Sequence, residues 1–435
     1  MEQRYYQKEI ETMPLEDMKA LQSERLVAQV KHVYENVPYY REKMDAAHVK
    51  PEDIHGVEDL HKLPFLSKAD LRDQYPYGLL AKPLKDCVRI QSTSGTTGRR
   101  VVAFYTQHDI DLWEDCCARA VTAVGGTDED VCQVCYGYGL FTGGMGLDFG
   151  ARKLGAMAIP MSAGNTKRQL MCMEDFGATA FACTPSYALY LAEAANEAGI
   201  VDKLRLKVGI NGAEPWTEEM RLKIEELLNV NCFDIYGLCE ITGPGVALEC
   251  IHHKGMHIYE DYFYPEVLNP ADHTPCADGE TGELVFTTLV KEGMPLLRYR
   301  TKDLTSIDHS TCECGRTLPR ISKFKGRTDD MKVIRGVNVF PTQVETALLS
   351  IGGGVAPHYI MIVDRENNLD VLTVMVEVDE KYFSDEIRKL DELKNKVAAV
   401  LKQALGVAVR VKLVEPKTIE RSEGKAKRVI DNRGL

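Results

Sequence analysis

The stretch of the chain best suited to chemistry is QSTSGTTGRR at positions 91–100, which combines serine and threonine hydroxyls with two glycines. Glycine lets the backbone approach a ligand closely, and successive amides in tight turns form a concavity that binds anions. Residues 92–98 therefore suit a chain of phosphates, and a solvated surface loop is the alternative for a generic run of this kind. The chain contains neither a Walker A motif nor a G-x-G-x-x-G motif after a strand, so those two nucleotide folds are excluded.

A second set of residues could bind a metal ion. Cys312 and Cys314 form a C-x-C pair in TCECGRTLPR, and Cys250 and His257 flank a turn upstream in the same β-rich region. Zinc takes four such ligands in a tetrahedral array, so we predict a structural zinc site. Thiols that bind no metal are the alternative, because C-x-C is a weaker signal than paired C-x-x-C motifs. The rival ligands are His252 and His253.

Alternating strand and helix patterns position these residues. Between about 85 and 240, apolar runs such as LKVGING alternate with helical segments such as SYALYLAEAANEAG, which predicts parallel strands joined by helices. Turn-punctuated β patterns follow, and an α/β pattern returns after residue 329. We predict an α/β fold with a large N-terminal domain of mixed and parallel sheets, a β-rich zinc-bearing subdomain within it, and a small α+β C-terminal domain. The predicted bounds are 1–328 for the N-terminal domain with its flanking helices, about 245–325 for the subdomain and 329–435 for the C-terminal domain.

Composition and charge exclude several classes of protein. The 53 basic and 65 acidic residues give a net charge of −12, which would repel a nucleic acid. We find no apolar stretch long enough to span a bilayer and no secretory signal, so we expect a cytoplasmic protein without a membrane partner. Most of the 13 cysteines lie in apolar surroundings and are expected to stay reduced.

Six segments of the chain resemble the motifs of one enzyme superfamily. STSGTTGR resembles the phosphate loop of the adenylate-forming enzymes, which join a carboxylic acid to AMP and then to a thiol. The other motifs follow in the family's order: NGAEP at 211–215, YGLCE at 236–240, YRTKD at 299–303, GRTDDMKVIRG at 326–336 and EGKAKR at 423–428. Local sequences such as HIYEDYFYPEV and IRGVNVFPTQVE are similar to those of phenylacetate-CoA ligases. The resemblance extends over essentially the whole chain. The resemblance implies a Mg²⁺-dependent enzyme that uses ATP, an aryl acid and coenzyme A.

The same resemblance implies which residues bind the nucleotide. Glu240 would bind Mg²⁺, Tyr236 would offer a flat face to adenine, and Asp303 would accept hydrogen bonds from the ribose hydroxyls. Without the resemblance, a tyrosine is more often a core residue. Next to the phosphate loop, Arg99 is a weaker candidate ligand for the β- and γ-phosphates. The expected ATP and AMP set is Ser92, Thr93, Ser94, Gly95, Thr96, Thr97, Gly98, Gly212, Ala213, Glu214, Asp234, Tyr236, Gly237, Asp303 and Arg327.

The expected catalytic residues are Lys425 and Glu240. By resemblance, the ammonium of Lys425 in RSEGKAKR bridges the attacking carboxylate and the α-phosphate, although such a basic run alone would be interpreted as a solvated tail. After diphosphate leaves, the C-terminal domain is expected to rotate about a hinge at Asp329 and withdraw the lysine. The turn bearing Gly336 would then line the channel for coenzyme A.

Aromatic residues and glycines in YGYGLFTGG at 136–144 predict an apolar pocket for the acyl group. Aromatic walls suit an arylacetate better than a long fatty acid, but phenylacetate, its ring-substituted analogues, indoleacetate and benzoate are not distinguished. Core packing is the alternative for any one pocket residue. The predicted pocket residues are Tyr136, Phe141, Gly143, Ala213, Ile241 and Pro244.

Two other functions stay open at the level of sequence. An adenylating enzyme could pass its acyl group to a carrier-protein thiol or to an amine instead of coenzyme A. A non-catalytic, zinc-containing nucleotide-binding protein is disfavoured by the joint presence of Glu240, Asp303, Arg327 and Lys425, because a binding module needs no mobile lysine. The oligomeric state is also open, although homodimers are common among relatives.

Overall fold

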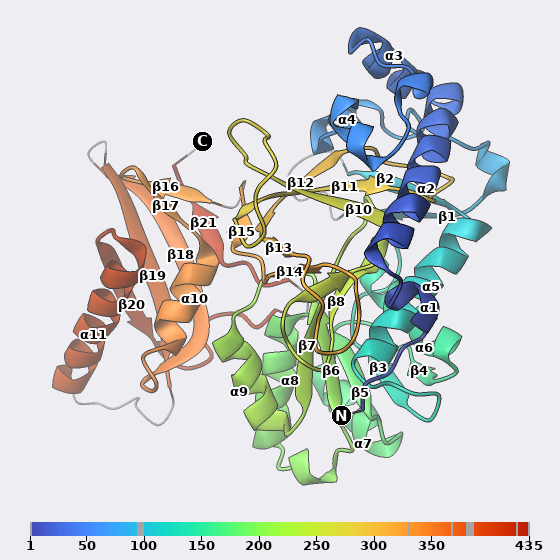
Figure 1. Cartoon of the computed structure of the whole chain (residues 1–435). Coiled ribbons are helices and arrows are strands. Elements are labelled where there is room, and N and C mark those ends of the chain that lie inside the picture. The colour runs from blue at the N-terminus through green and yellow to red at the C-terminus, as the bar shows by residue number, and fades with distance from the viewer. Residues whose placement is uncertain are drawn as a thin grey trace. The chain divides into compact units, whose positions relative to one another are not determined.

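The computed structural model of the chain describes most of its residues and divides into two compact units (Figure 1). The first unit comprises Met1–Cys183, Lys203–Ala213 and Asn231–Lys323, and the second comprises Thr184–Asp202, Glu214–Val230 and Phe324–Leu435. The described residues are 2–93, 100–328, 331–366, 369–379, 387–422 and 425–433.

Helices precede the sheets of the first unit. Apolar residues recur at helical spacing in the second of these helices, where Met18, Leu26 and Val33 are buried. Pro38 lies at the first position of the third helix, where the amide hydrogen that proline lacks would have no partner within the helix. Their bounds are α1 Lys8–Glu11, α2 Leu15–Asn36, α3 Pro38–Ala46 and α4 Lys68–Asp73.

The largest sheet of the first unit has nine strands in the order β13-β14-β9-β8-β7-β6-β5-β3-β4. The strands from β4 to β7 run parallel, as the alternating strand and helix patterns predict, and the strands from β7 to β13 run antiparallel. Their bounds are β3 Val131–Val134, β4 Met157–Ile159, β5 Ala180–Cys183, β6 Val208–Gly212, β7 Asn231–Leu238, β8 Gly243–Glu249, β9 Met256–Ile258, β13 Ile307–Asp308 and β14 Arg320–Ile321.

Two helices pack on the parallel part of this sheet. The buried core joins Val121 of α5 and Leu147 of α6 to strand residues such as Val134 and Ile210. The two helices approach closely, because a Cβ atom added at Gly150 of α6 would lie 2.5 Å from Cys117 of α5. The helix bounds are α5 Gln107–Ala123, α6 Thr142–Leu154 and, further along the chain, α7 Thr166–Asp175.

Smaller antiparallel sheets complete the first unit. Strands β1 and β2 form a hairpin whose connection contains the predicted phosphate loop. Strand β11 pairs with β10 and with β12, so the region that the turn pattern marks as β-rich contributes to two different sheets. The bounds are β1 Cys87–Ser92, β2 Val102–Thr106, β10 Phe263–Leu268, β11 Gly282–Thr288 and β12 Tyr299–Thr305.

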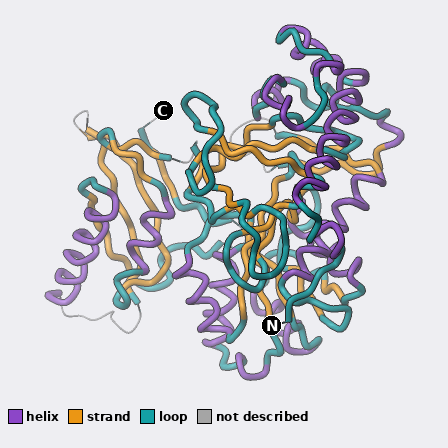
Figure 2. The backbone as a smooth tube through the Cα atoms, viewed as in Figure 1, coloured by secondary structure: helices purple, strands orange, loops and turns teal. Residues whose placement is uncertain are grey.

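The second unit contains a sheet in the order β20-β19-β18-β21 and a separate hairpin, β16-β17. Its helices and strands are distinguished by colour in Figure 2. The bounds are α8 Pro185–Glu197, α9 Glu218–Leu228, β15 Gly326–Arg327, β16 Lys332–Ile334, β17 Val337–Val339, α10 Pro341–Leu349, β18 Val355–Glu366, β19 Leu369–Val378, α11 Ile387–Leu405, β20 Val409–Val414 and β21 Val429–Asp431.

The core of the second unit lies between the sheet and the helices α10 and α11. Leu348 of α10 and Leu401 of α11 are buried against Met361 of β18 and Val374 of β19. The α/β class predicted from sequence is therefore confirmed, whereas the domain boundary at 328/329 stays a prediction. Among the helices within the described ranges, none combines the length and the apolar character needed to cross a membrane.

Candidate active site and metal cluster

The β1–β2 hairpin supports both ends of the predicted phosphate loop. Ser92 ends β1 and is buried, and its N–H donates to the carbonyl of Leu140 at 2.8 Å. The N–H of Thr93 donates to the carbonyl of Val101 at 3.0 Å, and the Thr93 hydroxyl accepts from the N–H of Val101 at 3.2 Å. The predicted phosphate ligands outside the described residues are Ser94, Gly95, Thr96, Thr97, Gly98 and Arg99.

Two predicted nucleotide residues from different sheets lie together. The Tyr236 hydroxyl, at the end of β7, donates to Oδ2 of Asp303 in β12 at 2.6 Å. The Tyr236 ring also stacks on Phe286, with ring centroids 6.3 Å apart. The arrangement places an aromatic face next to a carboxylate, which are the groups suited to a base and to a ribose.

The predicted glycines of this region are required by close approach of neighbouring strands. A Cβ atom at Gly212 would lie 2.0 Å from the carbonyl oxygen of Ile235, and one at Gly237 would lie 1.8 Å from that of Gly243. Ala213 follows with φ of 71°, a left-handed conformation. Asp234 is buried, and its N–H donates to a carboxylate oxygen of Glu249 at 2.9 Å.

Glu240 has a buried carboxylate held by two neighbours. The Tyr299 hydroxyl donates to its Oε1 at 3.3 Å, and Nζ of Lys68 lies 3.2 Å from the same oxygen. Magnesium prefers hard oxygen ligands, so this carboxylate fits the role predicted for it. Neither Lys68 nor Tyr299 was singled out from sequence, although Tyr299 begins the YRTKD motif.

The turn that carries Glu240 is held by buried donors that no sequence motif marks. The Tyr105 hydroxyl donates to the carbonyl of Thr242 at 2.8 Å, and Nζ of Lys291 donates to that of Ile241 at 2.5 Å. Burial lowers the pKa of Lys291 to about 8. Its ammonium lies 4.7 Å from the centre of the Tyr105 ring. A charged residue inside the apolar run TTLVKEGMPLL is the signal that could have identified this lysine.

The structure brings together part of the predicted acyl pocket. A Cβ atom at Gly143 would lie 3.2 Å from the ring of Tyr136, so the backbone at this glycine packs closely on a buried tyrosine. Phe141 is 48% exposed, whereas Ile241 is fully buried. The carbonyl of Pro244 accepts from the indole of Trp113 at 3.0 Å. The pocket as a whole remains a prediction.

The predicted catalytic lysine belongs to the second unit. Lys425 is exposed, and its carbonyl accepts from the Ser422 hydroxyl at 2.9 Å. Arg327 lies in β15, and Gly336 adopts φ of 81° in the turn between β16 and β17. The predicted hinge residue, Asp329, is outside the described residues.

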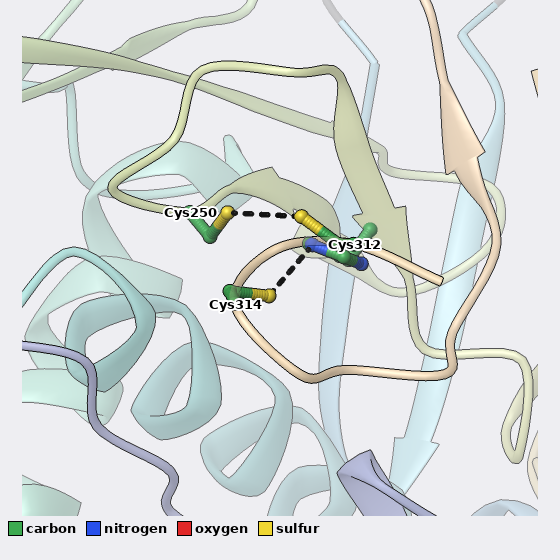
Figure 3. Close-up of side chains that lie close together, drawn as sticks. Cys250, Cys312 and Cys314 are labelled. Carbon is green, nitrogen blue, oxygen red and sulfur yellow. Dashed lines mark hydrogen bonds between the residues drawn. The ribbon is translucent and has the colours of Figure 1, made fainter. Parts of the chain in front are cut away.

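Three cysteines and one histidine form a buried cluster in the first unit. Their donor atoms all lie within 4.8 Å of one another. Cys250 follows β8 and His257 lies in β9, whereas the other two thiols come from the turn between β13 and β14. Sγ of Cys250 is 3.8 Å from Sγ of Cys312, and Sγ of Cys314 is 3.4 Å from Nε2 of His257 (Figure 3).

The histidine of the cluster is oriented as a zinc ligand would be. Nδ1 of His257 donates to the carbonyl of Leu318 at 3.1 Å, which leaves the Nε2 lone pair facing the thiols. The hydrogen bond between Cys250 and Cys312 lowers the pKa of the Cys312 thiol and raises that of the Cys250 thiol, so the pair favours one thiolate, the form that binds metals. The rival ligands face carboxylates instead: His252 lies 3.4 Å from Glu313, and His253 lies 3.4 Å from Glu249.

Comparisons with known proteins agree with this fold. The family model described as AMP-binding enzyme matches residues 10–289, and that described as AMP-binding enzyme C-terminal domain matches residues 336–433. A 2-hydroxyisobutyryl-CoA ligase in the postadenylation state, in complex with an acyl-AMP, is 29% identical with a TM-score of 0.93, covering 99% of this chain and 93% of that one. The fold and the motifs define an adenylate-forming enzyme with a large α/β N-terminal domain and a small C-terminal domain.

Curated relatives show which family of adenylate-forming enzymes this chain resembles. A phenylacetate-coenzyme A ligase of Thermus thermophilus is 47% identical over 443 residues, covering 98% of this chain and 99% of the relative. One of Escherichia coli is 46% identical over 429 residues, covering 98% and 97%. The chain belongs to the phenylacetate-CoA ligase family. It is an AMP-forming acid-CoA ligase, which forms an acyl-adenylate from ATP and then a thioester with coenzyme A.

Proposed function

We propose that the acid activated by this enzyme is an arylacetate, with phenylacetate as the first compound to test. The observation that carries the proposal is the identity of 46–47% to phenylacetate-CoA ligases over 98% of the chain. The aromatic residues Tyr136 and Phe141 in the segment predicted to form the pocket support it, because ligand pockets are lined largely by apolar and aromatic side chains. Phe141, Ala213, Ile241 and Pro244 are proposed to complete the pocket.

The first half-reaction brings two anions together, so the site must neutralise both. An oxygen of the substrate carboxylate attacks the α-phosphorus, the bond from that phosphorus to the bridging oxygen breaks, and diphosphate leaves. The ammonium of Lys425 is assigned to the charge that builds up between the carboxylate and the α-phosphate. The phosphate loop, Ser92–Gly98, is assigned to the β- and γ-phosphates.

The nucleoside part of ATP is assigned to residues near the end of β7 and to Arg327. Tyr236 would bind the base beside the segment Gly212–Glu214, and Asp303 would accept from the ribose hydroxyls. Asp234 and Gly237 belong to the same assignment. Mg²⁺, held by Glu240, would supply charge neutralisation at the phosphates.

The second half-reaction requires the thiol of coenzyme A at the carbonyl carbon. The sulfur attacks that carbon, AMP leaves with the bonding electrons, and the thiol proton goes to solvent. We assign the rotation of a C-terminal domain, 329–435, to a hinge at Asp329 and the coenzyme A channel to the turn at Gly336. Such a rotation would withdraw Lys425 after adenylation.

The Cys/His cluster is proposed to hold one structural Zn²⁺. Three thiols and one imidazole match the Cys₃His sites in which zinc is fully coordinated by protein. Such a site keeps no open position for substrate, so the metal would stabilise the fold rather than take part in the reaction. The ligands would be Cys250, His257, Cys312 and Cys314.

The test is diphosphate release by the purified protein with ATP, Mg²⁺ and phenylacetate, followed by detection of phenylacetyl-CoA after coenzyme A is added. Lys425→Ala should slow diphosphate release about 100-fold or more, because it removes a charge used in the transition state. Lys427→Ala, which changes an exposed neighbour, is the matched control. Absence of diphosphate release with any arylacetate would refute the substrate assignment.

The acceptor and the setting of the reaction are tested separately. Adenylate formation without any thioester to free coenzyme A would indicate a carrier-protein thiol or an amine as acceptor. We also propose that the enzyme acts in the cytoplasm, where ATP and coenzyme A are available. Gel filtration of the purified protein would show whether it is a homodimer.

A further inference from the structure

The carboxylate of Glu214 joins two parts of the second unit that are far apart in sequence. Its Oε1 accepts from the N–H of Ser186 at 2.7 Å and also from the Ser186 hydroxyl. Its Oε2 accepts from the N–H of Ala426 at 2.8 Å. One side chain thus links the start of helix α8 to the residue that follows Lys425.

The helix α8 fixes the carboxylate itself. Ser186 is the second residue of α8, so its N–H is among the first four of the helix, which have no partner within it. The partial positive charge at a helix N-terminus also favours a carboxylate there. The bonds to Ser186 therefore occupy one oxygen of Glu214 and leave the other aimed at Ala426.

A second attachment lies two residues beyond Ala426. The guanidinium of Arg428 lies 4.6 Å from the centre of the Tyr359 ring and 3.7 Å from Oε2 of Glu345. Glu345 is itself buried, and its Oε1 accepts from the N–H of Thr217 at 3.1 Å. The segment 425–428 is therefore attached to other parts of the second unit at two residues, Ala426 and Arg428.

The bond to Ala426 acts on the backbone next to the lysine. It restrains the peptide plane between Lys425 and Ala426, which adjoins the Cα atom that carries the lysine side chain. Lys425 is exposed and has a flexible four-carbon stem, so its backbone is the part that the protein can orient in advance. Small displacements of a catalytic group are costly to the rate.

We propose that Glu214 is a positioning residue for Lys425, and that its side chain acts in adenylation rather than in binding ATP. The proposal rests on the function proposed for Lys425. It is compatible with a role of the backbone of Gly212–Glu214 beside adenine, because only the side chain of Glu214 is assigned here. Since the proposed rotation withdraws Lys425 before thioester formation, the bond to Ala426 should matter for the first half-reaction alone.

The test compares Glu214→Gln with the wild type in each half-reaction. Glutamine keeps the size of the side chain but loses one acceptor oxygen, so it cannot accept from both backbone amides. Diphosphate release with phenylacetate should slow about 100-fold, the loss typical of a displaced catalytic group. Thioester formation from preformed phenylacetyl-adenylate and the KM for ATP should not change, and the Ala426 amide should exchange its hydrogen faster.

Glu219→Gln, a change in the first turn of α9, is the matched control and should leave all four measurements unchanged. Glu214→Asp, which keeps the charge but shortens the reach, should give an intermediate loss of diphosphate release if the glutamine variant does not fold. A higher KM for ATP with an unchanged kcat, or equal losses in both half-reactions, would overturn the proposal. If the wild type releases no diphosphate, the proposed function fails, and equal exchange at Ala426 in both proteins would still overturn the positioning role.

Discussion

The purified protein should contain one zinc ion, and Cys312→Ser should remove it. The four donor atoms of the cluster lie within 4.8 Å of one another and all four residues are buried. A serine hydroxyl stays protonated at neutral pH and is a poor ligand for zinc, so three ligands would remain. A site with three ligands would bind zinc far more weakly than the complete set.

The size of the effect follows from where the ligands lie. The turn after β8 and the turn between β13 and β14 are joined by the cluster, by the short pairing of β9 with β14, and by contacts of His252 and Lys254 with Glu313. An ion that binds only the folded chain at a thousand times its Kd stabilises it by about 4 kcal/mol. For a unit of this size that corresponds to a fall in Tm of about 7 °C when the ion is lost.

Elemental analysis and calorimetry on the same preparations measure both quantities. Cys172→Ser, which changes a buried cysteine of α7 outside the cluster, is the control and should keep its zinc. A strong chelator should lower the Tm of the wild type to that of Cys312→Ser. A wild type that carries no zinc and is indifferent to the chelator, or a Cys312→Ser variant that retains the ion, would refute the reasoning.

Two further predictions concern buried charges of the first unit. Arg119 is 1% exposed and binds Asp261 at 2.7 and 2.9 Å, so Arg119→Met should lower the free energy of unfolding in urea by about 3–5 kcal/mol. A loss no greater than that of the exposed Lys19→Met would contradict it. Burial raises the pKa of Glu260 from 4.5 to about 7, so this group stabilises the fold below pH 4.5 and that contribution is lost as the pH rises through 7. Glu260→Gln should therefore be more stable than the wild type at pH 8 by about 1–3 kcal/mol, and an equal pH dependence of unfolding in both proteins would contradict this.

The sequence predicted those features that depend on local pattern. Alternating apolar runs and helices predicted the parallel strands β3 to β7, because each such strand must be followed by a crossover. The choice of Cys250 and His257 over the neighbouring histidines also agrees with the cluster that the structure forms. Residue type and spacing pointed to these four residues because they lie in and next to turns of one β-rich region, whereas zinc binding itself stays a prediction.

Contacts between distant segments were not predictable in the same way. Lys291 binds the turn of Glu240, and Glu214 binds Ala426, although the partners are far apart in sequence. No sequence motif links the two members of either pair. The β-rich region likewise gave no sign that β9 would join one sheet and β10 another, because strand pairing depends on connections rather than on composition. Buried polar side chains in apolar runs were the available clue, and they identify a residue without its partner.

The discontinuous make-up of the second unit affects how the chain can fold during synthesis. The segments that contain α8 and α9 are synthesised well before the residues that bind them. Glu193 binds His358, and Glu214 binds Ala426, and both partners lie toward the end of the chain. A nascent chain that ends at residue 323 thus contains side chains such as Glu193 and Glu214 without their partners. Until the rest of the chain is synthesised, these polar groups must bind water or a chaperone. Splitting the gene at the proposed boundary would leave two fragments that each lack part of one compact body.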